Sequence, residues 1–413
     1  MGATIELGHY GDVTSGELWS VERHRELVLS DLHPMPVEPV ELDASLGLAL
    51  AHGEVAAFPL PPFANSAMDG YAVRAADVVN APVVLQVAAD IPAGNAGQRP
   101  LQPGTAHRIM TGAPIPDGAD AVIRVEWTDG GTSEVRIDRA VAVGAEIRPQ
   151  GDDVKVGDPL GRPGQAVTPA DIATFASFGI GQVAVHPRPR VAVVATGDEL
   201  TPLGEQRGPG MIFDSNSHLM SALVRGSGAH VVSAGHISDD IDAAVASLTG
   251  LADTADVIVT MGGVSAGAYE VVKDVFDRLG GVDFHGVAIQ PGKPQGFGYL
   301  NGVPVITLPG NPVSALVSFE LFVRPALRKL GGFEDLDRPR LVAALEVDIP
   351  VSPDRWRYLP GIVDSKRLVV SPVGRRGSHL IANAAGANCL IEVPSGRRPL
   401  AAGSTVDVLW LDG

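Results

Sequence analysis

The sequence predicts a multidomain α/β protein whose central part is a doubly wound parallel sheet. At 413 residues the chain is too long for a single ordinary core, so we expect three or four domains. Between residues 188 and 335, short β-branched apolar runs alternate with helical patterns, as in βαβ units. On both sides of this region, short strand-like pieces separated by Gly and Pro favour β-rich modules.

Composition argues against several classes of protein. The formal net charge is −17, from 31 Lys and Arg against 48 Asp and Glu, whereas a nucleic-acid surface needs a basic stripe. No apolar run reaches about 18 residues, and the first 20 residues lack the basic start and apolar centre of a signal peptide. The single cysteine, Cys389, argues against a disulfide framework. We therefore expect a cytoplasmic protein that binds neither nucleic acid nor membrane.

The N-terminal part is predicted to contain helical segments. Apolar residues within 17–32 recur at helical spacing, and residues 44–55 read as a second amphipathic segment. A further helix is predicted over 168–178, with Thr168 as its N-cap and Pro169 at its first position. These patterns assign residues 17–55 and 158–187 to a discontinuous helical and linker domain.

Residues 56–157 are predicted to form a β-rich insertion module. Their short β-rich pieces are separated by Gly and Pro, which is typical of an all-β or β-dominated unit. The pieces lie at 83–87, 107–110, 121–126 and 135–137.

Residues 188–335 carry the alternation of strands and helices that a doubly wound domain requires. The last helix is predicted to begin after Asn311 as N-cap, with Pro312 in its first turn and two glycines at its end. The predicted strands are 190–195, 230–234, 256–260, 283–290 and 303–308, and the predicted helices are 216–226, 240–251, 271–279 and 311–330.

Residues 336–413 return to short alternating segments. Such segments are typical of a small β-barrel or sandwich, and we assign this part to a C-terminal β-barrel. Its predicted strands are 341–347, 368–372, 389–393 and 406–411.

Five loops follow the predicted strands of the α/β domain. Because the carboxyl ends of parallel strands meet at one edge of a sheet, we expect all five loops to share one rim, where ligands bind in such folds. The loops are 196–200, 235–240, 262–267, 291–294 and 309–312.

The residue types in these loops fit a phosphorylated ligand held with Mg²⁺. Glycines such as Gly262 and Gly263 let backbone N–H groups approach an anion, and Lys293 supplies a positive point charge. Taken alone, each carboxylate is more simply a helix cap or a solvated surface charge, and Asp240 could cap the helix that follows it. The convergence of the five loops favours a functional rim. The candidate metal ligands are Asp198, Glu199, Asp239 and Glu270.

Several long motifs together resemble one family. They are NSAMDGYA at 65–72, MTGAP at 110–114, TGDEL at 196–200, GGVS at 262–265, PGKP at 291–294 and LPGNPVS at 308–314. They occur in order, and GSH at 377–379 continues the match into the last domain. The chain is similar to the molybdopterin molybdenumtransferases, which complete molybdenum cofactor synthesis and are related to the E domain of gephyrin.

The resemblance implies a fold of four subdomains and a reaction. The α/β domain would be like that of molybdopterin adenylyltransferases, and members form elongated homodimers. Their cleft lies between the α/β domain of one subunit and the β-rich module of the other. The implied activity is a Mg²⁺-dependent transfer that takes adenylylated molybdopterin and molybdate and gives molybdenum cofactor and AMP. Implied partners are molybdopterin adenylyltransferase and the molybdoenzymes that receive the cofactor.

Motifs and loops together give the predicted site residues. The resemblance assigns catalytic roles to Asp69, Thr111, Asp153, Glu199 and Asp239. The residues expected to bind the pterin substrate are Gly262, Gly263, Ser265, Gly267, Lys293, Pro309, Pro312 and Ser378. The expected ligands of Mg²⁺ are Glu199, Asp239 and Glu270. Three residues depart from the family's usual ones: Glu270 replaces Asp, Gln290 replaces Lys, and Pro360 replaces Arg, with Arg355 or Arg357 as possible substitutes.

Two other functions are compatible with parts of the sequence. A molybdopterin adenylyltransferase would share the α/β domain, although the motifs at 65–72 and 111–114 argue against it. A non-catalytic, gephyrin-like scaffold would instead bind peptide at a dimer or barrel surface.

Overall fold

The computed structural model describes residues 17–94, 99–264, 271–375 and 377–411. The chain divides into two compact units. The first unit comprises Met1–His52, Pro163–Ile172 and Gln182–Gly413, and the second comprises Gly53–Arg162 and Ala173–Gly181. The domain boundaries expected from the sequence stay predictions.

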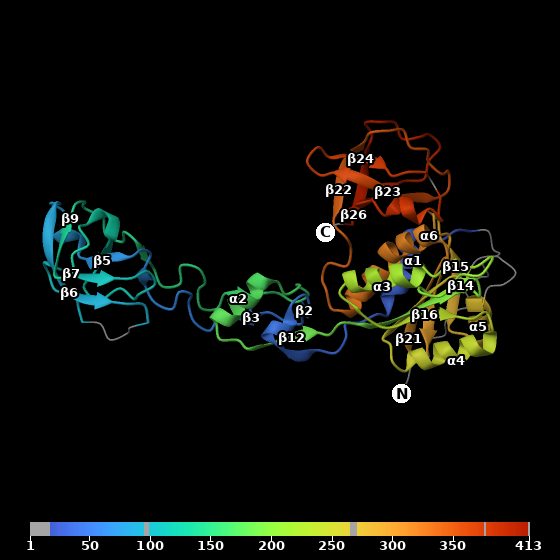
Figure 1. Ribbon diagram of the computed structural model, residues 1–413, viewed down its shortest axis with the longest axis horizontal. Helices are drawn as coiled ribbons and strands as arrows, with labels where there is room; N and C mark the ends of the chain where they lie inside the picture. The colour runs from blue at the N-terminus through green and yellow to red at the C-terminus, as the bar shows by residue number, and fades with distance from the viewer. Residues whose placement is uncertain (1–16, 95–98, 265–270, 376, 412–413) are drawn as a thin grey trace. The chain divides into compact units, whose positions relative to one another are not determined.

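A six-stranded sheet forms the centre of the first unit, and its strand order is β16-β13-β17-β21-β20-β18. Two of its strands, β16 and β21, are labelled in Figure 1. Four strands are parallel, and β20 runs antiparallel to both of its neighbours. The predicted doubly wound α/β domain is thus confirmed. The strands are β13 (Arg190–Thr196), β16 (His230–Ile237), β17 (Val257–Met261), β18 (Val282–Gly286), β20 (Pro294–Leu300) and β21 (Val303–Leu308).

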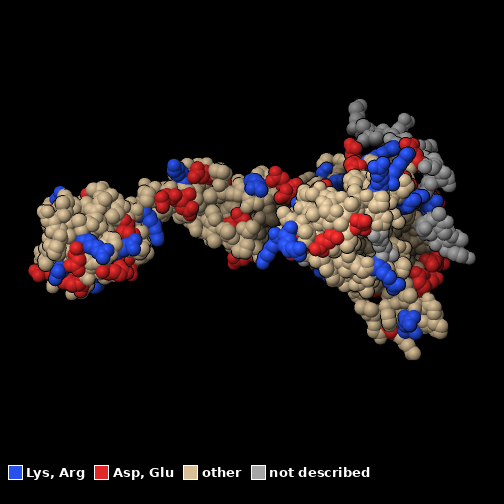
Figure 2. Space-filling view, turned by 90° about the horizontal axis from the view of Figure 1, so that it is seen from above, with Lys and Arg blue, Asp and Glu red and all other residues tan. Residues whose placement is uncertain are grey.

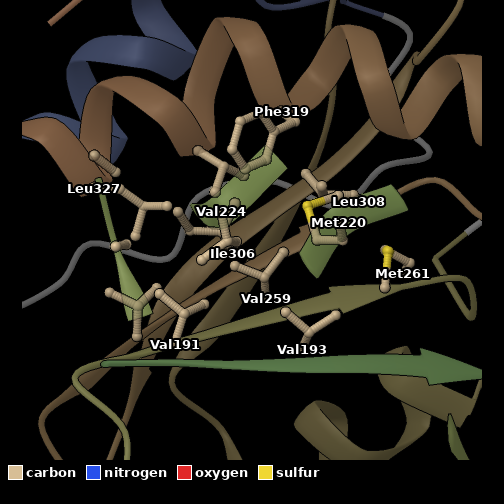
Figure 3. Packing of buried hydrophobic residues seen from close by; sticks show 14 of the residues in the cluster. Val191, Val193, Met220, Val224, Val259, Met261, Ile306, Leu308, Phe319 and Leu327 are labelled. Carbon is tan, nitrogen blue, oxygen red and sulfur yellow. The ribbon is translucent and has the colours of Figure 1, made fainter. Parts of the chain in front are cut away.

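Helices cover both faces of this sheet. Alternate residues of β13 separate the two cores, because Val191 and Val193 pack on one face and Ala192 and Val194 on the other. Figure 3 shows the first core, where Phe319 and Met220 lie over the sheet residues. The helices on this face are α1 (Val21–Ser30), α3 (Asn216–Gly226), α6 (Pro312–Ser318) and α7 (Arg324–Leu330), and those on the other are α4 (Ile241–Ala252) and α5 (Val271–Leu279).

The long helix predicted after Asn311 is interrupted by one π-helical turn. Helices α6 and α7 are joined by η4 (Phe319–Val323), and Asn311 precedes the first helical residue, Pro312, as predicted. The turn places Glu320 in the interior with its side chain 0% exposed. Its carboxylate receives a hydrogen bond from Nε of Arg338 at 3.2 Å and lies 4.0 Å from Nε of Arg324. A buried ion network therefore lies in the segment that leads into the C-terminal barrel.

The predicted C-terminal barrel is confirmed as a closed five-stranded sheet, drawn in orange and red in Figure 1. The sheet closes because β23 pairs with both β24 and β25. A short strand of the α/β domain, β19 (Ile289–Gln290), joins the barrel by pairing in parallel with β23. The barrel strands are β22 (Arg340–Leu345), β23 (Trp356–Asp364), β24 (Val369–Pro372), β25 (Cys389–Val393) and β26 (Thr405–Trp410).

The N-terminal segments of the described chain, which reach from the first unit into the second, differ in part from the prediction. Residues 44–55 contain no helix longer than the 3₁₀ turn η1 (Leu42–Ser45), and they supply the short strands β2 (Ala49–Leu50) and β3 (Glu54–Val55). Strand β2 pairs with β12 (Gln182–His186), which also pairs with β1 (Glu38–Glu41). The amphipathic segment predicted at 44–55 therefore forms short paired strands and not a helix.

The helix predicted at 168–178 is confirmed as α2 (Pro169–Ser177). Thr168 caps it, since the Thr168 Oγ1 accepts the backbone N–H of Asp171 at 3.2 Å, and Asp171 in turn accepts the backbone N–H of Thr168 at 2.8 Å.

The second unit is β-rich, as predicted. Its five-stranded sheet has the order β8-β5-β7-β6-β9 and buries Tyr71, Ile123 and Ile137 on one face. Ile109 and Val122 lie in a second, smaller core. The strands of this sheet are β5 (Gly70–Val73), β6 (Val83–Ile91), β7 (Thr105–Ile109), β8 (Ala121–Arg124) and β9 (Glu134–Ile137). Two strand pairs lie outside it, β3 with β11 (Pro159–Leu160) and β4 (Asn65–Ser66) with β10 (Ile147–Arg148).

Charges of both signs are interspersed on the face of the molecule drawn in Figure 2. Within the part of the chain that the structure describes, no helix is long and apolar enough to cross a membrane.

A buried histidine of α1 is expected to make the stability of the first unit depend on pH. His24 is 0% exposed, packs edge-on against Phe322, and burial followed by the charge of His285 lowers the pKa of His24 from 6.5 to about 3. The pKa of His24 is lower in the folded than in the unfolded protein. The free energy of unfolding is therefore not reduced by His24 above about pH 6.5, and it falls as the pH drops from there toward 3. Between pH 7.5 and 5, His24 alone is expected to cost about 2 kcal/mol of unfolding free energy.

Denaturant unfolding at the two pH values measures this loss. In a His24→Leu variant the loss between pH 7.5 and 5 should be smaller than in the parent protein by about that amount. Equal pH dependence of the two proteins would contradict the prediction.

Candidate functional site

One cleft of about 1000 Å³ lies at the carboxyl ends of the parallel strands in the first unit. Each of the five loops expected to share this rim contributes at least one lining residue. The barrel supplies the opposite wall, including Arg357, Arg375 and Ser378. The prediction that the five loops meet is therefore confirmed, and the barrel completes the enclosure.

Two glycines after β17 line the cleft and require a backbone that other residues rarely adopt. Gly262 and Gly263 have φ values of 92° and 64°. A Cβ atom on Gly262 would lie 2.8 Å from Oγ1 of Thr196, and one on Gly263 would lie 2.8 Å from the backbone nitrogen of Val272. The chain thus brings bare backbone to the cleft, as an anion site requires. Ser265, Gly267 and Glu270, which were also predicted to belong here, lie outside the described residues.

The loop at 309–312 joins β21 to α6 and contacts the barrel through hydrogen bonds to Ser378. Pro309 and Pro312 line the cleft. Between them, Asn311 donates a hydrogen bond from Nδ2 to Oγ of Ser378 at 3.0 Å, and the backbone N–H of Val313 donates to the Ser378 carbonyl at 3.0 Å. The predicted binding serine therefore lies directly against the predicted loop.

The carboxylates at the other side of the cleft come from the loops after β13 and β16. Glu199 and Asp239 both line the cleft. Asp198 accepts the backbone N–H of Asp239 at 3.0 Å, and its own N–H donates to Oδ2 of Asp239 at 3.4 Å, so the two loops are tied together. Asp240 is the N-cap of α4, and its Oδ1 accepts the N–H of Ala243 at 2.8 Å. Asp240 is thus structural, while Asp239 faces the cleft.

Two carboxylates of the cleft fit the usual protein ligands of Mg²⁺. Among the described residues, no group of three His, Cys, Asp or Glu side chains is close enough to hold a metal ion. Mg²⁺, however, is commonly bound by one or two carboxylates, with waters and substrate phosphates completing its shell. Glu199 and Asp239 would be those two carboxylates.

Among the described residues that line the cleft, positive side chains outnumber negative ones, although the whole chain is acidic. The basic lining residues are Lys293, Arg355, Arg357 and Arg375, and the acidic ones are Glu199, Asp214 and Asp239. Tyr358 also lines the cleft, and burial raises the pKa of its hydroxyl, so it is neutral. A cleft of this charge favours an anionic ligand.

Sequence reasoning missed several lining residues. Arg375 lines the cleft and stands two residues before the GSH motif. Its position next to this motif could have identified it as a site residue. Asn216 donates from Nδ2 to the Gly310 carbonyl at 2.6 Å and so links α3 to the loop at 309–312, which no local pattern indicated. Gln290 and Pro360, the two departures among described residues, also line the cleft.

Three predicted catalytic residues lie in the second unit. Oδ1 of Asp69 accepts two hydrogen bonds from Thr111, from the backbone N–H at 2.7 Å and from Oγ1 at 2.8 Å. These bonds, the backbone one first, lower the pKa of Asp69. Asp153 is exposed, and its backbone N–H donates to the Leu60 carbonyl at 3.0 Å. Asp69 and Thr111 thus form one ionised, exposed pair.

Family models match nearly the whole chain in three consecutive parts. Residues 19–179 match the "MoeA N-terminal region (domain I and II)", residues 192–329 match a "Probable molybdopterin binding domain", and residues 342–411 match the "MoeA C-terminal region (domain IV)".

Whole-length relatives agree with these models. The chain is 45% identical over 399 residues to molybdopterin molybdenumtransferase 2 of Mycobacterium tuberculosis, covering 94% of this chain and 98% of that protein. It is 35% identical to the molybdopterin molybdenumtransferase of Bacillus subtilis, covering 91% and 90%. The crystal structure of the molybdopterin biosynthesis moeA protein of Pyrococcus horikoshii matches with a TM-score of 0.81 and 30% identity, covering 95% of this chain and all of that one.

Proposed function

Because this chain belongs to the molybdopterin molybdenumtransferase family, it is a transferase that inserts molybdenum in cofactor biosynthesis, and we propose that it uses adenylylated molybdopterin and molybdate and releases AMP. The observation that carries the proposal is the cleft, where bare glycine backbone and basic side chains face two carboxylates. Adenylylated molybdopterin and molybdate are both anions, and such a cleft suits both.

In the proposed reaction, water breaks the phosphoanhydride bond between the molybdopterin phosphate and AMP. The two dithiolene thiols form two S–Mo bonds, and their two protons leave with one oxide ligand of molybdate as one water molecule. Lys293 and the glycine backbone at 262–263 bind the phosphates. Ser378, whose Oγ accepts a hydrogen bond from Asn311, supplies a hydroxyl to the cleft that Lys293 and Arg375 also line, and we place molybdate at this serine.

Glu199 and Asp239 are the residues that would hold Mg²⁺. The ion, when bound, offsets phosphate charge as AMP leaves. The protein positions one of these carboxylates through the paired bonds between Asp198 and Asp239, since the N–H of Asp198 donates to Oδ2 of Asp239.

The reaction is tested with the purified chain, adenylylated molybdopterin, Mg²⁺ and molybdate. We expect AMP release that depends on molybdate and on Mg²⁺, together with a product that activates a molybdenum-free molybdoenzyme. Intact substrate after incubation would refute the proposal. Incubation of molybdopterin with ATP tests the adenylyltransferase alternative, for which we expect no adenylylated product.

We also propose a homodimer in which the β-rich module of one subunit supplies Asp69, Thr111 and Asp153 to the cleft of the other. The family resemblance supports this arrangement. Coexpression of Asp69→Asn and Lys293→Ala chains provides the test, because a mixed dimer regains one intact cleft. Random pairing should restore about a quarter of the parent activity. No recovery in isolated mixed dimers would mean that each cleft uses residues of one chain only.

Thr111 is expected to control the pH range over which Asp69 works as a carboxylate. A Thr111→Val variant keeps the backbone N–H but loses the Oγ1 donor, so the pKa of Asp69 should rise toward its ordinary value. The activity, which we assign to the ionised form, should then begin to fall at a higher pH on acidification than in the parent protein. A pH profile of AMP release measures this, and an unshifted acid limb would contradict it.

A further inference from the structure

A glutamine side chain lies buried against the loop that carries Lys293. Gln295 is the second residue of β20 and is 1% exposed. Its Nε2 donates to the Gly292 carbonyl at 2.6 Å and to Oγ of Ser318 at 2.6 Å. Because a carbonyl oxygen can only accept, the atom that faces Gly292 must be the amide nitrogen, and this fixes the orientation of the amide.

Core stability does not explain a glutamine at this place. Its Oε1 is buried and has no hydrogen-bond partner among the described residues, which is unfavourable. Its neighbour on the same face of β20, Phe297, is part of the apolar core under the long helix. An apolar side chain of similar size would pack there without an unpaired oxygen. The glutamine thus leaves one buried oxygen unpaired, while its amide nitrogen satisfies the Gly292 carbonyl and the Ser318 hydroxyl.

The loop around Lys293 needs such a restraint. Gly292 has φ of 111°, and a Cβ atom on it would lie 3.0 Å from Oγ of Ser318 and 3.1 Å from Cδ1 of Ile289. On the other side, the Lys293 carbonyl accepts the N–H of Val287 at 2.7 Å. The backbone is thus held both before and after the lysine, whose exposed side chain lines the cleft.

We propose that Gln295 is a positioning residue for substrate binding. Its amide holds the Gly292 carbonyl, and Ser318 holds the amide, so the Lys293 backbone is fixed before substrate arrives. A lysine side chain is flexible, and a fixed backbone reduces the entropy that is lost when its ammonium group meets an anion. The proposal rests on the function proposed above, since it takes Lys293 to bind the anionic substrate.

The test replaces Gln295 with Met, which has a similar length and no donor. We expect the KM for adenylylated molybdopterin to rise about tenfold while kcat stays within about twofold, because binding and not chemistry is affected. The unfolding midpoint should change little, because the loss of the two hydrogen bonds that Nε2 donates is offset by removal of the unpaired Oε1. Ser318→Ala, which keeps the bond to Gly292, should raise the KM less, and Gln295→Leu provides a second variant in case Met packs poorly.

A matched control is Gln165→Leu. Gln165 also donates from its side-chain amide, to Oδ1 of Asp171 at 2.9 Å, and it does not line the cleft. Its loss should leave the KM unchanged. Hydrogen exchange of the peptide that contains Gly292 and Lys293 gives a readout without turnover, and Gln295→Met should speed it several-fold.

These measurements separate the two proposals. If the parent protein releases no AMP but exchange at Gly292 and Lys293 still rises in Gln295→Met, the proposed function fails and the positioning role stands. If the parent protein is active and neither the KM nor the exchange changes in the variant, the positioning role is wrong. A lower unfolding midpoint with an unchanged KM would likewise reduce Gln295 to a packing residue.

Discussion

Asp239→Asn is expected to slow molybdenum insertion by about a hundredfold or more. This is the range found when a side chain that takes part in acid–base or metal-ion catalysis is removed. Asparagine keeps the shape of the side chain and can still accept the N–H of Asp198, so the two loops should stay tied together. What is lost is the negative charge of Asp239, one of the two carboxylates that we assign to Mg²⁺. The Mg²⁺ concentration for half-maximal AMP release should therefore also rise.

The neighbouring residue provides the control for this variant. Asp240 caps α4 and does not line the cleft. Asparagine is as good an N-cap as aspartate, so Asp240→Asn should change neither rate nor Mg²⁺ requirement. AMP release measured over a range of Mg²⁺ concentrations compares the two variants. Equal rates for Asp239→Asn and the parent protein would remove Asp239 from the site.

Glu320→Gln is expected to lower the free energy of unfolding by about 3–5 kcal/mol, as when one member of a buried ion network is removed. The side chains of Arg324 and Arg338 are only 8% and 11% exposed, and both face Glu320. Burial, followed by the charge of Arg338, lowers the pKa of Arg324 to about 10, so this guanidinium already lies in an unfavourable environment. Without the carboxylate, the two positive charges would have to share the same interior.

Urea denaturation followed by circular dichroism measures this change. Asp242 offers a matched surface carboxylate, because it pairs with Arg278 while its side chain is 80% exposed. Asp242→Asn should change the unfolding free energy by less than about 1 kcal/mol. A similarly small change for Glu320→Gln would show that the network contributes little.

The regular part of the α/β domain could be predicted because its strands are buried and apolar. The helix at 216–226 and the cap at Asp240 follow the prediction to the residue. Strand β20 was missed because its sequence, PQGFGYL, is rich in glycine. Those glycines are needed for close approach, since a Cβ atom on Gly298 would lie 1.8 Å from the Gly281 carbonyl. A lone sequence does not show which backbone will be that near.

Strand β23 and the segment at 44–55 were missed for a different reason. Pro360 and Gly361 stand in the middle of β23, where they normally argue against a strand. The strand forms because pairing with β24 and β25 on either side closes the barrel. At 44–55, the partner strand β12 is more than 120 residues away in the chain, so local spacing carries no information about it.

The candidate site was predictable where it depends on chain direction. Parallel strands place their following loops on one edge of the sheet, and this rule alone predicts that Glu199, Asp239 and Lys293 share a rim. The barrel wall was less accessible to such reasoning, because Arg375 reaches the cleft only through the packing of two domains. Likewise, Gln295 has no motif of its own, and only its hydrogen bonds distinguish it from a strand residue.

Strand β19 has a consequence for how this protein can be divided or recombined. The family models separate the chain between residues 329 and 342, yet Ile289 and Gln290 pair with Trp356 and Arg357 of the barrel. The segment that the family model delimits as the C-terminal region is therefore not the segment that can be exchanged as a structural unit. A chimera that takes only its C-terminal region from a relative would inherit a barrel edge made for another protein's strand. A chimera should therefore take β19 and its loop from the same parent protein as the barrel.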